Sequence, residues 1–160
     1  KEYTATITLG ATTPSYDLET EINNTFDISN ITKEDILQCA QSFVGEQNQL
    51  PPIFSAKKID GKRAYNLARA GEEVKVKPNK ITIYEMEVLE VNLPEIKVRI
   101  ACSKGTYIRS IAFDFGEKLE NGAHLTELRR TKIGEYDVND AHSIEEVQQW
   151  IFDSEFTPLN

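Results

Sequence analysis

The chain holds 160 residues, enough for one domain with its own hydrophobic core. Its 39% hydrophobic and 28% charged residues are typical of a globular protein, and no run of about 18 apolar residues predicts a membrane span. The formal net charge of −8 argues against a nucleic-acid partner only if the charges are spread evenly over the protein. The two cysteines and two histidines lie far apart in the sequence, so they predict neither a disulfide framework nor a metal site.

A strand pattern opens the chain, because Tyr3, Ala5, Ile7 and Leu9 alternate with threonines. A strand that begins at the first residue suggests that upstream sequence has been removed. The opening residues include no apolar leader, so we expect no signal peptide and a cytoplasmic protein. Residues 10–20 follow as a predicted loop.

The first predicted helix begins after Thr32, which can cap it, and ends at Gly45. Pro51-Pro52 then breaks the chain before a short predicted strand over residues 53–59. Within residues 61–71 the spacing of small and aromatic residues predicts a second helix between two glycines.

Two further strands, 81–91 and 96–102, form a predicted hairpin with its turn at 92–94. Helical spacing covers residues 107–119. The segment 125–136 is ambiguous, and we interpret it as a short helical turn followed by a strand.

Ser143 and Glu146 form a predicted capping box for a last helix that runs through Trp150. The mixture of elements predicts an α+β fold, with a mixed, largely antiparallel sheet and flanking helices. We expect a single domain over residues 1–160, in which 137–160 form an acidic C-terminal helix and tail.

The charges are unevenly distributed along the chain. Residues 57–75 hold six basic side chains against three acidic ones, and residues 101–134 hold six against four. Residues 135–160 hold seven acidic side chains and no basic one. A local basic face can bind phosphates on an acidic protein, although such runs can equally be ordinary solvated charges.

Three segments carry unusual motifs. They are residues 51–71, which contain PPIFSAKKIDGKRAY, residues 102–110, CSKGTYIRS, and residues 122–131, GAHLTELRRT. In this order and spacing, together with the opening Lys1-x-Tyr3, they resemble the bacterial tRNA pseudouridine synthase B family. The resemblance covers residues 1–136, and CSKGTYIR is its most specific string.

This resemblance implies a pseudouridine synthase catalytic-domain fold, of which the chain would be the C-terminal part. It also implies an activity: one T-loop uridine of tRNA is flipped out, detached from its sugar, rotated and rejoined through carbon. The implied partner is the T stem-loop of tRNA, the implied enzyme is a monomer, and neither cofactor nor metal is required.

The nucleophile that the resemblance implies is an aspartate in a Gly-x-Leu-Asp-Pro motif, and the sequence contains no such motif. We therefore assign no nucleophile and expect the chain alone to be inactive. Arg109 would pair with that aspartate in the family, so here we expect it to face an open cleft or to use another acceptor.

Five positions match active-site residues of the family, and four of them are matched to substrate contacts. By resemblance, Tyr3 contacts the target base and takes part in proton removal, Tyr107 lies under the base, and Leu128 walls the uracil pocket. Asp17 matches a loop aspartate near the substrate, while Arg109 holds the nucleophile. From pattern alone, the tyrosines and Leu128 could be core residues and Arg109 a surface charge.

The loop around Asp17 departs from the family pattern, because Pro14 and Ser15 replace an Asp-Thr pair and Thr20 replaces a glycine. These departures put the role of Asp17 in question. Candidate phosphate contacts, each of which could also be a solvated surface charge, are Lys57, Lys58, Arg63, Lys104, Arg129 and Arg130.

Two alternative functions remain open. The first is a non-catalytic RNA-binding module, which the missing motif favours. The second is an interaction domain without an RNA partner, which a calculated pI near 4.9 favours.

Overall fold

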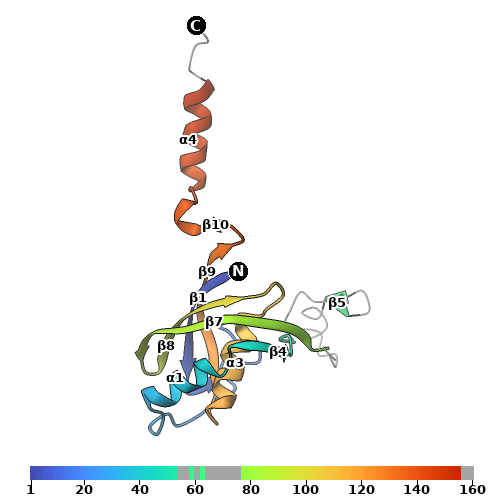
Figure 1. Ribbon diagram of the computed structural model, residues 1–160, viewed down its shortest axis with the longest axis vertical. Coiled ribbons are helices and arrows are strands. Elements are labelled where there is room, and N and C mark those ends of the chain that lie inside the picture. Colours follow the sequence, from blue (N-terminus) through green and yellow to red (C-terminus); the bar gives the residue numbers. More distant parts are fainter. Residues whose placement is uncertain (54–57, 60–61, 64–76, 156–160) are drawn as a thin grey trace.

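The structure, a computed structural model, describes residues 1–53, 58–59, 62–63 and 77–155. Six strands form one antiparallel sheet in the order β10, β9, β1, β8, β7 and β4 (Figure 1). These strands are β1 Glu2–Leu9, β4 Gly45–Gln49, β7 Asn79–Asn92, β8 Glu95–Cys102, β9 Ala123–Ile133 and β10 Tyr136–Asp137. The short pairs are β2 Ala11–Thr12 with β3 Asn24–Thr25, and β5 Lys58–Ile59 with β6 Lys62–Arg63.

Two helices, α1 and α3, pack on one face of this sheet, and a third, α4, lies apart from it (Figure 1). The helical elements of the described residues are α1 Lys33–Gln41, α3 Ile108–Lys118, the 3-10 turn η1 Val138–Asp140, and α4 Ile144–Glu155. This arrangement confirms the predicted α+β fold class with a largely antiparallel sheet and flanking helices.

The cap of α1 is a reciprocal capping box between Thr32 and Asp35. The Thr32 hydroxyl accepts the Asp35 backbone N–H at 3.2 Å, and the Asp35 carboxylate accepts the Thr32 N–H at 2.8 Å. Ser143 and Glu146 exchange the same two bonds at the start of α4. Both predicted helix starts are therefore confirmed.

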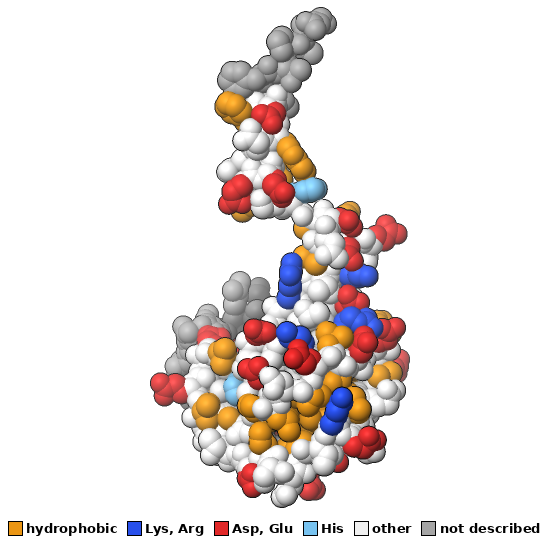
Figure 2. Space-filling model, turned by 90° about the vertical axis from the view of Figure 1, so that its left-hand side faces the viewer, with side chains coloured by type: hydrophobic (Ala, Val, Ile, Leu, Met, Phe, Trp, Pro, Cys, Tyr) orange, Lys and Arg blue, Asp and Glu red, His pale blue; other side chains and the backbone are white. Residues whose placement is uncertain are grey.

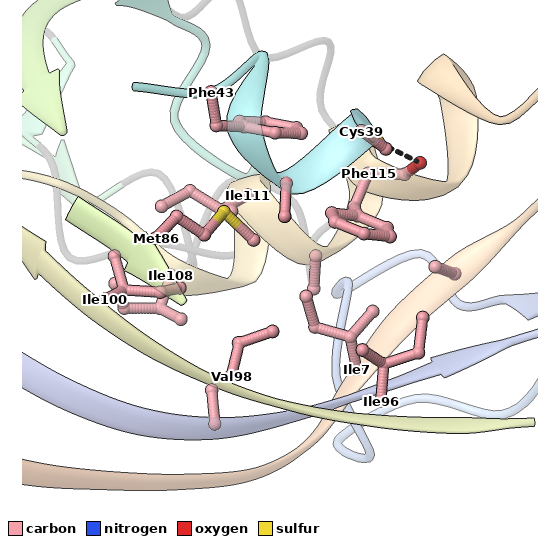
Figure 3. Close-up of a cluster of buried hydrophobic side chains, with 14 of the residues drawn as sticks. Ile7, Cys39, Phe43, Met86, Ile96, Val98, Ile100, Ile108, Ile111 and Phe115 are labelled. Carbon is pink, nitrogen blue, oxygen red and sulfur yellow. Dashed lines mark hydrogen bonds between the residues drawn. The ribbon is translucent and has the colours of Figure 1, made fainter. Parts of the chain in front are cut away.

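The core lies between the sheet and the two helices. Ile7 and Val98 on neighbouring strands are fully buried and face Ile111 and Phe115 of α3 (Figure 3). Phe43 follows α1 and stacks on Phe115, with ring centroids 5.8 Å apart. The alternation that predicted β1 therefore corresponds to one side of the strand facing this core.

Three local predictions differ from the structure. The segment 125–136 contains no helical turn, because β9 runs as a strand from Ala123 to Ile133. Gly45 does not end the first helix, because α1 ends at Gln41 and Gly45 begins strand β4. Of the strand expected over 53–59, only Lys58–Ile59 is a strand in the described residues. Of the helix expected within 61–71, only residues 62–63 are described, and they form strand β6.

An arm connects the body to α4. It consists of the far end of β9 with β10 and η1, and α4 projects beyond it (Figure 1). Figure 2 shows basic side chains on this arm and acidic ones on the helix beyond it. No helix in the described part of the chain is long and apolar enough to cross a membrane.

Candidate active site

Arg109 and Asp17 form an ion pair between the start of α3 and the loop after β2. The Arg109 Nη1 donates to Asp17 Oδ2 at 3.1 Å, and the two side chains are 22% and 24% exposed. Such a pair is only partly shielded from water, so its Coulomb attraction is moderate. We expected Arg109 to face an open cleft or to use another acceptor, and in the structure its guanidinium contacts Asp17.

This ion pair lines a pocket with a cavity volume of about 350 Å³. Leu128, which is 48% exposed, forms part of the wall. The complete lining is Asp17, Leu18, Glu19, Arg109, Leu125, Thr126, Glu127 and Leu128. The pocket therefore brings together three of the sequence-predicted residues, Asp17, Arg109 and Leu128.

A larger hollow of about 540 Å³ lies along β1 and β9 and also reaches Leu128. Its other lining residues include Thr4, Thr6, Lys97 and Arg129, but neither Asp17 nor Arg109. Size alone does not identify a site. We assign the candidate active site to the smaller pocket, because it holds the charged pair and an apolar wall together.

Tyr3 lies next to this pocket and does not line it. Cross-strand pairing places Tyr3 opposite Arg130 and Ala5 opposite Leu128 on β9. Directly opposed residues share one face of a sheet, so Tyr3 and Leu128 lie on the same face, one pair apart. The Tyr3 side chain is half-buried and packs against the core.

Tyr107 is the N-cap of α3 and has no side-chain cap bond of its own. Gln49 holds its backbone instead: the Tyr107 N–H donates to Gln49 Oε1 at 2.8 Å, and Gln49 Nε2 donates to the Tyr107 carbonyl at 3.0 Å. Gln49 is 2% exposed. Ser110 adds a 2.7 Å bond from its hydroxyl to the Leu50 carbonyl.

These contacts fix the strand-to-helix turn that carries both Tyr107 and Arg109. Sequence reasoning missed Gln49. A polar residue two positions before a Pro-Pro pair was a signal, but it did not reveal a partner 58 residues away.

The loop that carries Asp17 is held from several sides. Asp17 Oδ1 accepts the Ser15 hydroxyl at 2.6 Å and the Glu19 N–H at 3.0 Å, while the Asp17 carbonyl accepts the Thr13 hydroxyl at 2.7 Å. Ser15 is fully buried and Thr13 is 2% exposed. Tyr16, at φ 66°, adopts the left-handed conformation, and the next residue, Asp17, lines the pocket.

Tyr16 anchors this loop to the rest of the molecule. Its ring stacks on Phe113 of α3 with centroids 4.1 Å apart, and its carbonyl accepts the Leu125 N–H at 2.8 Å. Burial, then Asp114 and Glu117, raise the pKa of Tyr16. Burial first and Glu117 second raise the pKa of Asp114 to about 6, against an opposing effect of Lys118.

The predicted phosphate contacts are dispersed. Lys104 is exposed in the turn after β8, whereas Arg129 and Arg130 are exposed on β9 with opposite orientations. Lys58 and Arg63 pair across the β5–β6 hairpin, and nothing further is described of their side chains. Lys57 lies outside the described residues.

No group of three or more His, Cys, Asp or Glu side chains among residues 1–53 and 77–155 is placed to hold a metal ion. The two cysteines, Cys39 and Cys102, are buried free thiols. Burial raises the pKa of Cys39 to about 11.

Two sequence profiles match the chain. The TruB family pseudouridylate synthase N-terminal domain matches residues 1–108, and the tRNA pseudouridylate synthase B C-terminal domain matches residues 109–158. Their boundary falls in the first turn of α3.

Curated relatives named tRNA pseudouridine synthase B are similar over most of the chain. The protein from Phocaeicola vulgatus is 54% identical over 151 residues, which are 94% of this chain and 64% of that protein. The one from Flavobacterium johnsoniae is 56% identical over 144 residues, 90% of this chain and 63% of that protein. The chain thus spans a little under two thirds of these relatives.

Solved structures share the fold. A chain in the crystal structure of a Cbf5-Nop10-Gar1 complex superposes with a TM-score of 0.71 at 24% identity, covering 100% of this chain and 38% of the other. A chain in an H/ACA RNP bound to a substrate RNA containing 2′-deoxyuridine gives a TM-score of 0.64, also at 24% identity, over 97% of this chain and 35% of the other.

Proposed function

The chain belongs to the TruB family of pseudouridylate synthases, and from that premise we propose that it forms part of an enzyme that isomerises a T-loop uridine of tRNA to pseudouridine. The observation that carries the proposal is the pocket in which Arg109, Asp17 and Leu128 meet. These residues come from three separate segments. Arg109 and Leu128 lie in segments that match family motifs, and Asp17 matches a family position within a loop that departs from the family pattern.

In the proposed reaction the bond from uracil N1 to the sugar C1′ breaks, the base turns within the pocket, and C5 bonds to C1′. The proton on C5 leaves and N1 gains one, so atoms balance without an oxidant. Tyr3 offers a ring face for the flipped base and a hydroxyl for the proton transfer. Tyr107 lies under the base, and Leu128 excludes water from its edge.

Arg109 orients the nucleophilic carboxylate in this proposal. A guanidinium has five N–H donors in a planar fork, so it can hold Asp17 and a second carboxylate together. The sequence contains no Gly-x-Leu-Asp-Pro motif, so no residue of this chain is assigned as nucleophile, and we propose that the 160-residue chain alone does not turn over.

The T stem-loop is the proposed partner, with its phosphates on the basic segments. Lys57, Lys58, Arg63, Lys104, Arg129 and Arg130 are the proposed contacts. Such contacts position RNA without reading its sequence. We further propose a cytoplasmic monomer in which residues 1–136 belong to the catalytic domain and 137–160 form an acidic helix and tail.

Unmodified tRNA transcripts test this function. The 160-residue chain, and the same chain preceded by a segment that carries the Gly-x-Leu-Asp-Pro motif, are each incubated with transcript, and pseudouridine is measured by mass spectrometry. Product at the T-loop uridine is expected only with the longer chain. Turnover by the shorter chain contradicts the missing-nucleophile proposal, and no product from either contradicts the function.

The second candidate is a non-catalytic RNA-binding module, favoured by the missing motif. It predicts salt-dependent binding of a T-arm hairpin by the 160-residue chain without any product. Binding that is absent at low salt would instead favour an interaction domain without an RNA partner.

A further inference from the structure

Ser15 and Thr20 contact each other inside the loop that carries Asp17. The Ser15 N–H donates to Thr20 Oγ1 at 3.0 Å, and the two hydroxyl oxygens lie 2.8 Å apart. These are two of the three positions at which the loop departs from the family pattern. The side chains at positions 15 and 20 are therefore linked directly by a hydrogen bond.

The hydrogen atoms in this cluster have one consistent arrangement. An ionised Asp17 carboxylate can only accept, so the Ser15 hydroxyl donates its single proton to Asp17 Oδ1, the shortest bond of the group at 2.6 Å. Ser15 then has no proton for Thr20, and Thr20 must donate to Ser15 Oγ. The chain runs in one direction, from Thr20 through Ser15 to Asp17.

This direction assigns different tasks to the two oxygens of Asp17. Oδ1 accepts from Ser15 and from the Glu19 N–H, whereas Oδ2 accepts from Arg109 Nη1 at 3.1 Å. Each donor in a chain polarises the next, so the Thr20 hydroxyl strengthens the bond from Ser15 to the carboxylate. Ser15 is fully buried, so water does not replace a partner that it loses.

We propose that Ser15 and Thr20 are positioning residues, whose hydrogen-bonded chain fixes the Asp17 carboxylate so that its second oxygen holds the Arg109 guanidinium in the pocket. The catalytic consequence rests on the proposed function, whereas the positioning itself does not.

The test compares Thr20→Val with Thr20→Ser in the full-length protein. Valine keeps the shape and loses the hydroxyl, while serine keeps the hydroxyl. Thr25→Val, at an exposed position of β3, is the matched control. Backbone amide exchange is measured by NMR, and kcat and KM are measured on tRNA transcript.

In Thr20→Val the Ser15 amide loses its acceptor directly, so its exchange accelerates whether or not the proposal holds. The informative amide is that of Glu19, because its N–H donates to Asp17 Oδ1 and not to the Thr20 hydroxyl. We expect its exchange to accelerate about fivefold, the kcat to fall by about fivefold to tenfold, and KM to change less than twofold, from the loss of about one hydrogen bond. Thr20→Ser and Thr25→Val are expected to match wild type.

An unchanged Glu19 amide in Thr20→Val, with the Ser15 amide accelerated, overturns the proposal, because the effect then stops at the serine. So does a Thr20→Ser variant that behaves like Thr20→Val. The exchange readout does not depend on turnover: a wild-type protein that makes no pseudouridine removes the proposed function, while Glu19 still decides the positioning.

Discussion

Arg129 and Arg130 are consecutive on β9, yet their side chains lie on opposite faces of the sheet. Arg129 pairs with Thr4 of β1, and Arg130 pairs with Tyr3. Tyr3 and Leu128 share the Arg130 face, whereas Arg129 belongs to the face with Lys97. The double-arginine motif therefore does not act as a single basic patch.

Single alanine variants should separate the two arginines. Arg130→Ala is expected to weaken binding of a T-arm hairpin and to reduce the slope of log K against log salt by about one. Arg129→Ala should change both quantities less, because its side chain faces away from the candidate pocket. Titrations at several salt concentrations measure the slope, and a larger effect of Arg129→Ala would place the RNA on the other face.

Arg109→Lys in the full-length protein should lower kcat while tRNA affinity changes little. Lysine keeps the charge but loses the planar fork that can hold two carboxylates. The pair with Asp17 is partly exposed, so we expect a cost of about 1.5–3 kcal/mol, the range for a hydrogen bond to a charged group. Single-turnover kinetics and a binding titration check the two halves. An equal loss of affinity would mean that Arg109 contacts RNA phosphate.

Gln49→Leu should destabilise the fold, because it leaves the Tyr107 N–H without its buried partner and removes one of the two hydrogen bonds to the Tyr107 carbonyl, which still accepts the Ile111 N–H. The expected loss in the free energy of unfolding is about 1–3 kcal/mol for one unsatisfied N–H. Gln41→Leu, at an exposed position of α1, is the control and should be near neutral. Urea unfolding measures both. Equal stability of the two variants would show that Gln49 is not a structural clamp.

Asp114→Asn should raise stability at neutral pH and not at acidic pH. The pKa of Asp114 is raised to about 6, mainly by burial, from an ordinary value of 3.8. Between those values the unfolded state loses its proton first, so the contribution of Asp114 to stability falls as pH rises. Above pH 6 the gain in the free energy of unfolding of the variant is at most about 3 kcal/mol. The gain is smaller than this maximum because the carboxyl group is partly exposed to water.

Unfolding by urea at pH 4 and pH 7 measures this difference, with exposed Asp140→Asn as the control. A gain from Asp114→Asn that is the same at both pH values would contradict the assignment to ionisation.

The regular elements were predictable where a local signal existed. Threonine alternation predicted β1, and cap residues predicted the starts of α1 and α4. Strand β9 was harder to predict, because its charged half lies on the arm and its side chains there are mostly exposed. Strand β4, with sequence GEQNQ, has almost no apolar residue and forms because β7 pairs with it. A strand that depends on its partner carries no local pattern.

The candidate site was also only partly predictable from the sequence. Motif resemblance selected Asp17, Arg109 and Leu128, which the structure brings into one pocket. It could not find Gln49 or the bond between Ser15 and Thr20, because amide and hydroxyl groups are common at surfaces and only their burial reveals a task. The opposite orientation of Arg129 and Arg130 also followed only once β9 was known to be a strand.

The central position of β1 has a consequence for how the chain acquires its structure. Both neighbours of β1 come late in the sequence: Tyr3 pairs with Ile100 on β8 and with Arg130 on β9. During synthesis at about 5–20 residues per second, β1 therefore waits several seconds for either of these two neighbours. The local hairpin β7–β8 can form first and serve as a template. Until β9 leaves the ribosome, one edge of β1 keeps unpaired backbone N–H and C=O groups, and such an edge can pair with another chain.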